Sequence, residues 1–169
     1  MTMSYISTMK RRILSAARRL AALKRKGEAA IVIFEDGHEE LLVGTELSVP
    51  VPLTGIHGRA KAIVHTHPVP RTAPSLADLY TLIVMARLGV PSYMATVYST
   101  GKTATITIYT ATKPLFGLEQ TILKKAARYE KLNMETIFDP GISNKQVVEQ
   151  HAMLAKLGVT VERYRVTLT

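Results

Sequence analysis

The sequence predicts an α/β fold in which a mixed central β-sheet is flanked by helices. Three observations support this class. Apolar residues follow helical spacing near the N-terminus, and β-branched runs bounded by turn residues follow. A further apolar helix divides these runs into two groups, which favours a sheet with helices packed on it. The chain has 169 residues, enough for one domain with its own core, so we expect a single domain over residues 1–169.

The first predicted element is a helix, because its apolar residues recur at alternating steps of four and three. We expect Ser7 or Thr8 to cap the start of this helix and Gly27 to end it. The apolar residues are Met9, Ile13, Ala16, Leu20 and Leu23.

A β-hairpin is expected next. Residues 28–35 are apolar and β-branched on both faces, as in a central strand. Asp36-Gly37 is a typical hairpin turn and leads into a second strand over residues 38–45. Pro50 and Pro52 demote the following segment to an edge strand or a loop.

The middle of the chain predicts a buried strand, a buried helix and a second hairpin. The strand covers residues 61–67 and stops at Pro68. The helix covers residues 76–88, apolar on nearly all sides, and ends at Gly89. Strands over residues 92–99 and 103–110 flank a Thr-Gly-Lys turn.

A helical extension is expected over residues 113–169, beyond a core of about residues 7–110. Helices are predicted over 115–132 and 144–157, separated by the breaker Asp139-Pro140-Gly141, before a last candidate strand over 159–168.

Composition excludes several chemistries. The chain has no cysteine, so a metal ion must be held by nitrogen and oxygen donors. No apolar stretch approaches the roughly 20 residues of a membrane span. We therefore expect no membrane insertion and a cytoplasmic location.

The net charge of +9 is concentrated at the N-terminus. A basic face of this kind binds nucleic acid, an acidic partner or an anionic membrane surface, or is simply the solvated side of a helix, which we favour. An organellar transit peptide is a further alternative, disfavoured by the helical apolar pattern. Residues 1–27 contain no acid and hold Lys10, Arg11, Arg12, Arg18, Arg19, Lys24, Arg25 and Lys26.

The segment from His65 to Asp78 has the spacing of a metal site. Residues two apart on a strand face the same side, about 6.6 Å apart, so His65 and His67 can bind one ion. Asp78 would lie in the first turn of the following helix and supply a carboxylate. Two nitrogens, one carboxylate and an open position are typical of a catalytic zinc site.

A purely structural interpretation is also available. Two histidines on a strand are commonly polar neighbours, and Ser75-x-x-Asp78 has the pattern of a helix-capping box. The capping and ligand interpretations are compatible, because a helix terminus fixes the carboxylate in place.

The pattern resembles the signature of the JAMM (MPN-plus) family of zinc metalloproteases: His-x-His, seven residues, Ser, two residues, Asp. The chain matches at His65, His67, Ser75 and Asp78, and the order of elements over about residues 7–110 is similar. The resemblance implies a JAMM-like layout, related to that of cytidine deaminases. It also implies Zn²⁺ held by the two histidines and the aspartate.

The family also places a glutamate at the start of the first strand, and Glu28 matches that position. The resemblance implies that Glu28 transfers protons as general base and acid and that the Ser75 hydroxyl stabilises the oxyanion. Burial would raise the pKa of such a base. The rival glutamates are Glu35, Glu39, Glu40 and Glu46.

The implied activity is hydrolysis of an amide bond in a protein or peptide, with the C-terminus of a ubiquitin-like modifier as the implied substrate. The segment between Glu46 and Ala60 is short, which leaves the substrate open. Alternatives are a non-catalytic scaffold and a nucleic-acid-associated module using the basic helix. A zinc deaminase is discarded, since its Cys-x-x-Cys motif is absent. His57 and His151 are expected to be surface or satisfied core histidines.

Overall fold

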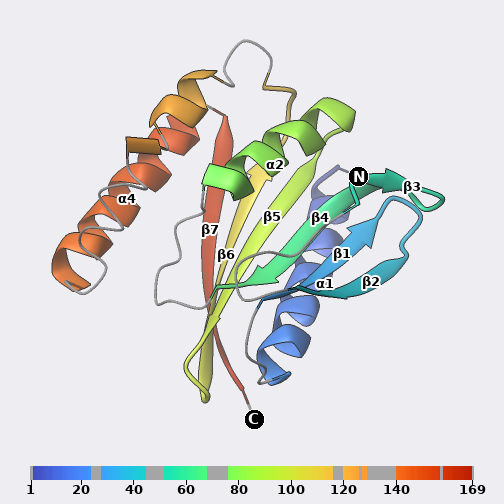
Figure 1. Cartoon of the computed structure of the whole chain (residues 1–169), viewed down its shortest axis with the longest axis horizontal. Coiled ribbons are helices and arrows are strands. Elements are labelled where there is room, and N and C mark those ends of the chain that lie inside the picture. Colours follow the sequence, from blue (N-terminus) through green and yellow to red (C-terminus); the bar gives the residue numbers. More distant parts are fainter. Residues whose placement is uncertain are drawn as a thin grey trace.

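The computed structural model of the chain describes residues 2–23, 28–44, 52–67, 76–115, 120–125, 127–128, 140–156 and 158–168. Figure 1 shows the elements in chain order. They are α1 (Thr2–Ala22), β1 (Ala29–Phe34), β2 (Glu39–Val43), β3 (Thr54–Gly55), β4 (Gly58–Thr66), α2 (Leu76–Leu88), β5 (Ser92–Ser99), β6 (Thr103–Ala111), α4 (Pro140–Lys156) and β7 (Val159–Thr167). Residues 120–125 and 127–128 are also helical.

The predicted mixed sheet flanked by helices is confirmed. Its strands follow the order β2-β1-β4-β5-β6-β7, and the short β3 pairs with β4. Both expected hairpins form, β1 with β2 and β5 with β6. Only β4 and β5 run parallel, and α2 makes the crossover between them. The segment after residue 113 adds both α4 and the edge strand β7, which pairs with β6.

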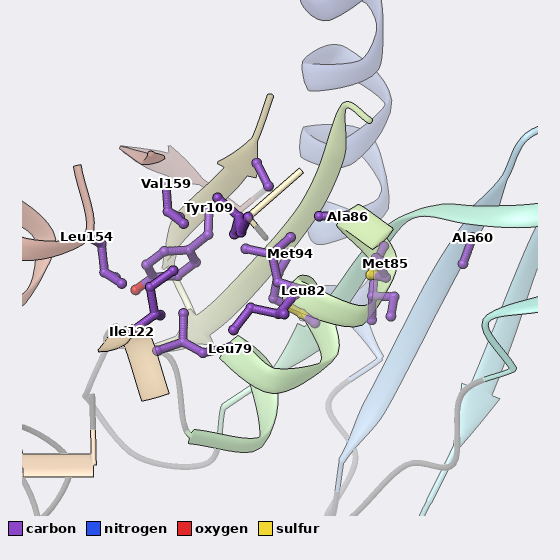
Figure 2. Packing of buried hydrophobic residues seen from close by; sticks show 14 of the residues in the cluster. Ala60, Leu79, Leu82, Met85, Ala86, Met94, Tyr109, Ile122, Leu154 and Val159 are labelled. Atoms are coloured by element: carbon purple, nitrogen blue, oxygen red, sulfur yellow. The ribbon is translucent and has the colours of Figure 1, made fainter. Parts of the chain in front are cut away.

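Helices cover both faces of the sheet (Figure 1). α1 packs on one face, where Ile13, Ala17 and Leu20 meet Ile31 and strand residues of β4, β5 and β6. α2 and α4 lie over the other face. Figure 2 shows Tyr109 on this second face, close to Leu154, Ile122 and Val159. Because both faces are covered, every residue of β1 is buried, as expected for a central strand.

A register shift in β4 decides which of its side chains face α2. Ile33 pairs with Ala62, but the next residue, Phe34, pairs with Ala60. Beyond this bulge the side chains alternate regularly, so Ile63 packs under α2 and Val64 under α1. His65 and His67, two and four residues after Ile63, therefore lie on the α2 face.

Arg59 holds the far end of α2 against the sheet. Its guanidinium donates hydrogen bonds to the Gly89 carbonyl at 3.1 Å, the Pro91 carbonyl at 3.2 Å and the Ser92 hydroxyl at 3.1 Å. A side chain at Gly89 would overlap this guanidinium, because its Cβ would lie 2.7 Å from Cζ of Arg59. The α2–β5 connection is thus fixed to the start of β4.

Some predicted boundaries were wrong. α1 begins at Thr2, so Ser7 and Thr8 lie inside the helix instead of capping it; Gly27 lies outside the described residues. α4 begins at Pro140, inside the predicted breaker, because proline is tolerated in a first helical turn whose N–H groups have no intrahelical partner.

The other boundaries are closer to prediction. β4 begins at Gly58, three residues before the expected start, and the helix over residues 76–88 has the expected bounds. Leu115 is buried but not helical, and residues 129–132 of the expected 115–132 helix lie outside the described part.

Several basic residues of α1 have acidic partners. Arg12 and Arg19 share Glu39, at 3.0 and 2.8 Å, and Lys10 pairs with Glu162 on β7. Arg11 and Arg18 are exposed. Within the described residues, no helix combines the length and the apolar character needed to cross a bilayer.

Candidate metal centre

The two histidines of the His-x-His motif lie where β4 ends. His65 is the second-last residue of β4, and His67 follows the strand with its backbone N–H donating to the Val97 carbonyl at 2.8 Å. Both side chains face α2 because they are two residues apart on extended chain. Asp78 is in the first turn of α2, which begins above this end of the strand. The spacing seen in the sequence therefore brings the three side chains together.

Their donor atoms form one compact group. Asp78 Oδ1 lies 3.1 Å from His65 Nε2, and Asp78 Oδ2 lies 3.3 Å from His67 Nε2. One donor atom from each residue lies within 4.8 Å of the other two. The three side chains are only 7–14 % exposed. Two imidazole nitrogens and a carboxylate in this arrangement can hold a divalent cation.

His65 is oriented as a metal ligand. Its Nδ1 lies 3.3 Å from the backbone carbonyl of Thr66, which accepts a hydrogen bond from Nδ1–H. Nε2 is then the nitrogen available to a cation; it is buried and lies 3.1 Å from Oδ1 of Asp78. A nitrogen buried beside a carboxylate is satisfied by a proton or by a bound cation. The donor set therefore fits a metal ion, and a backbone carbonyl on the second nitrogen is a common support for such histidines.

The three side chains are strongly coupled electrostatically. Burial disfavours the charged form of His65, but the adjacent Asp78 carboxylate and, more weakly, Glu28 favour it, so the pKa of His65 is raised. Burial also disfavours ionised Asp78, yet His65 and His67 outweigh this effect and hold its pKa well below the usual range. The cluster thus keeps an ionised carboxylate between the two imidazoles.

Glu28 lies beside this cluster. Ala30 pairs with His65, so the register places residue 28 opposite His67 and on the same face of the sheet. Burial raises the pKa of Glu28; His65 and His67 lower it, and Asp78 raises it further. The register therefore sets Glu28 beside His67, and its carboxyl interacts electrostatically with all three candidate ligands. The backbone carbonyl of Glu28 accepts from Gly44 N–H at 3.0 Å, which anchors the start of β1.

Three of the four rival glutamates lie away from the metal centre. Glu35 is at the opposite end of β1 and accepts from the Arg59 backbone N–H. Glu39 is paired with arginines of α1, and Glu40 is on the edge strand, 4.0 Å from His38. Glu46 lies outside the described residues. Among the described glutamates, only Glu28 has a pKa shifted by the three candidate ligands.

Ser75, the predicted oxyanion-stabilising residue, lies outside the described residues. The capping interaction proposed for the Ser75-x-x-Asp78 pattern is therefore not described either.

The two remaining candidate histidines are not part of the centre. His57 bonds to Asp36 at 2.7 Å and stacks on His38 near the β1–β2 turn. His151, on α4, lies 3.2 Å from the Tyr109 hydroxyl. Burial, together with the charge of Arg163, lowers the pKa of His151 to about 4. Each histidine has its own partner, as the sequence led us to expect.

Thr66 is a supporting residue that the sequence analysis missed. Its carbonyl orients His65, and its hydroxyl accepts a hydrogen bond from the backbone N–H of Ala29 at 3.1 Å. The residue thereby ties the ligand strand to the residue next to Glu28. The sequence could have indicated this supporting role, because a residue between two histidines on a strand must face the opposite side of that strand.

Comparison of the chain with protein-family models, with curated proteins and with solved structures found no match.

Proposed function

We propose that the chain is a zinc-dependent hydrolase that cleaves amide bonds, with the JAMM-like layout that its motif implies. The observation that carries the proposal is the convergence of His65, His67 and Asp78 beside the half-buried carboxyl of Glu28. A ligand set without a nearby base would suit metal storage or structural binding equally well. A carboxyl of raised pKa beside the candidate ligands is instead typical of a hydrolytic site.

The donor chemistry favours zinc among the common cations. Two imidazoles and one carboxylate suit zinc, whereas magnesium and calcium prefer all-oxygen sets. When bound, zinc acts as a Lewis acid and lowers the pKa of a coordinated water towards 7. His65, His67 and Asp78 would hold the ion, and the Thr66 carbonyl would keep Nε2 of His65 directed at it.

Glu28 is the proton carrier in this proposal. Its carboxylate accepts a proton from the water that adds to the amide carbon, and it then donates that proton to the departing amine. Hydrolysis is balanced in this way: the C–N bond breaks, the carbon gains hydroxyl and the nitrogen gains hydrogen. Ser75, from its place in the motif, would donate a hydrogen bond to the carbonyl oxygen as negative charge develops there.

The proposed substrate is a protein or peptide, with an isopeptide or peptide bond at the C-terminus of a ubiquitin-like modifier as the first choice. This choice of substrate comes from the resemblance of the motif to the JAMM signature. The proposed metal chemistry itself requires only that the substrate contain an amide bond.

Removal and return of the metal test the proposal directly. We expect the purified protein to contain one zinc per chain by elemental analysis and to cleave a mixture of internally quenched peptides. Dialysis against a chelator should abolish cleavage, and stoichiometric zinc should restore it. A protein that binds no zinc when zinc is supplied would overturn the proposal.

Zinc affinity is expected to fall as the pH falls. A cation must displace any proton on His65, and the raised pKa of this residue means that displacement already costs free energy above pH 6.5. Each displaced proton weakens binding by up to about tenfold per pH unit below the pKa. Competition titrations against a chelator between pH 6 and 8.5 measure this slope. Equal affinities at pH 6 and pH 8 would contradict it.

A further inference from the structure

Two rows of side chains run across the sheet from the metal centre to its far edge. His65 pairs with Thr96, Thr96 with Thr107, and Thr107 with Arg163. Directly paired residues point to the same face, so this row shares the face of the metal centre.

The second row begins one pleat later on the same face. Thr66 pairs with Val97, so the next residue, His67, lies beside Tyr98. Tyr98 pairs with Thr105, and Thr105 pairs with Arg165. Both rows thus end at an arginine of β7.

The second row is accessible from outside. Tyr98 and Thr105 are half-buried and Arg165 is exposed, while Thr96 and Thr107 of the first row are buried. The β5–β6 hairpin and β7 extend past the end of β4, beyond the part of the sheet that α2 overlies (Figure 1). Among the described residues, this surface leads from the outside of the sheet to the metal centre.

The charge of this surface is wholly positive. The strands β5, β6 and β7 contain a single acidic residue, Glu162, which alternates to the α1 face and pairs there with Lys10. Arg163 and Arg165 are exposed and form no ion pair among the described residues. By contrast, Arg12 and Arg19 on the α1 side share Glu39. The cations on the metal-centre face are thus left available for an external anion.

The strand spacing defines the length of a matching ligand. Neighbouring strands lie about 4.8 Å apart, so the three steps from β4 to β7 span roughly 14 Å. An extended peptide advances about 3.3 Å per residue, and this span therefore covers about four residues.

We propose that the substrate crosses β5, β6 and β7 in extended form and carries an acidic side chain about four residues from the cleaved bond. Arg163 and Arg165 bind that carboxylate, because guanidinium groups form strong charge-assisted hydrogen bonds with carboxylates. This inference rests on the proposed hydrolase function and names the class of substrate, a peptide segment with Asp or Glu at this distance.

The test uses the full-length zinc-loaded protein and a mixture of peptides with randomised residues, whose products are identified by mass spectrometry. We expect Asp and Glu to be enriched three to five residues from the cleaved bond, on one side. For a matched pair of peptides with Glu or Gln at the selected position, kcat/KM should differ by about tenfold to a hundredfold. The double variant Arg163→Gln/Arg165→Gln should reduce this ratio to about one.

The double variant Arg11→Gln/Arg18→Gln removes the same charge from the α1 face and should keep the wild-type ratio. Thermal unfolding followed by circular dichroism verifies that both variants are folded. Cleavage without acidic preference, or a preference that survives in Arg163→Gln/Arg165→Gln, overturns the inference and leaves the hydrolase function intact. Absence of any cleavage overturns both. Arginine-dependent binding of oligothymidylate, with no binding of the Glu peptide, would assign the surface to nucleic acid instead.

Discussion

Asp78→Asn is expected to leave the protein folded and nearly free of zinc. Asp78 supplies the only carboxylate among the three candidate ligands, and its oxygens lie 3.1 and 3.3 Å from the two imidazole Nε2 atoms. The amide keeps the shape of the side chain but removes the negative charge that offsets the cation. We expect the zinc content to fall below a tenth of an equivalent and the affinity to fall at least about 100-fold. Elemental analysis and a chelator competition measure these two quantities.

Asp36→Asn is the matched control for this experiment. Asp36 also bonds to a histidine, His57, at 2.7 Å, but the pair lies at the β1–β2 turn, away from the metal centre. This variant should keep one zinc per chain. Equal zinc contents in Asp78→Asn and the wild type would show that Asp78 is a helix-capping residue and not a ligand.

Glu28→Gln is expected to abolish hydrolysis while the metal stays bound. Glutamine occupies the same space but cannot accept the proton that hydrolysis releases from water. Loss of a general base typically lowers the rate by about 10²- to 10⁴-fold. The zinc content should be unchanged, because the metal centre has its own donors in His65, His67 and Asp78. Cleavage of the best peptide, measured beside elemental analysis, separates the two effects.

Glu40→Gln supplies the control for the base. Val32 pairs with Glu40, so this glutamate lies on the same face of the sheet as Glu28, but on the edge strand and away from the ligands. Its replacement should leave the rate within about twofold of the wild type, since isolated surface charges contribute little. Full activity of the Glu28→Gln protein would show that another residue acts as the base.

The candidate metal ligands could be identified from a short piece of sequence because their geometry is local. The two-residue period of a strand places His65 and His67 on one face, and the first turn of α2 carries Asp78. The β-hairpins and α2 were predictable for the same reason, since turn residues and apolar periodicity act over a few residues. The start of α1 and the start of α4 were mispredicted because capping preferences are weak and packing overrides them.

The location of Glu28 beside the candidate ligands depended on the pairing of two strands that are distant in the sequence. Its resemblance to a family position suggested the role, but its proximity to the ligands follows from the antiparallel register of β1 and β4, with Ala30 opposite His65. A shift by one residue would point the carboxyl to the α1 face. The bulge at Ile33 and Phe34 changes the register between β1 and β4, and no local sequence pattern predicts it.

By itself, the sequence determined the donor atoms available to a metal, the absence of thiolates and the local elements that carry His65, His67 and Asp78. These properties reside in residue types and in one segment of 14 residues, from His65 to Asp78. Only the tertiary structure decided that Arg163 and Arg165 share the face of the metal centre, whereas Glu162 and most described cations of α1 pair on the other side. Strand order and register are set by pairings between distant segments, and the face of each side chain follows from them.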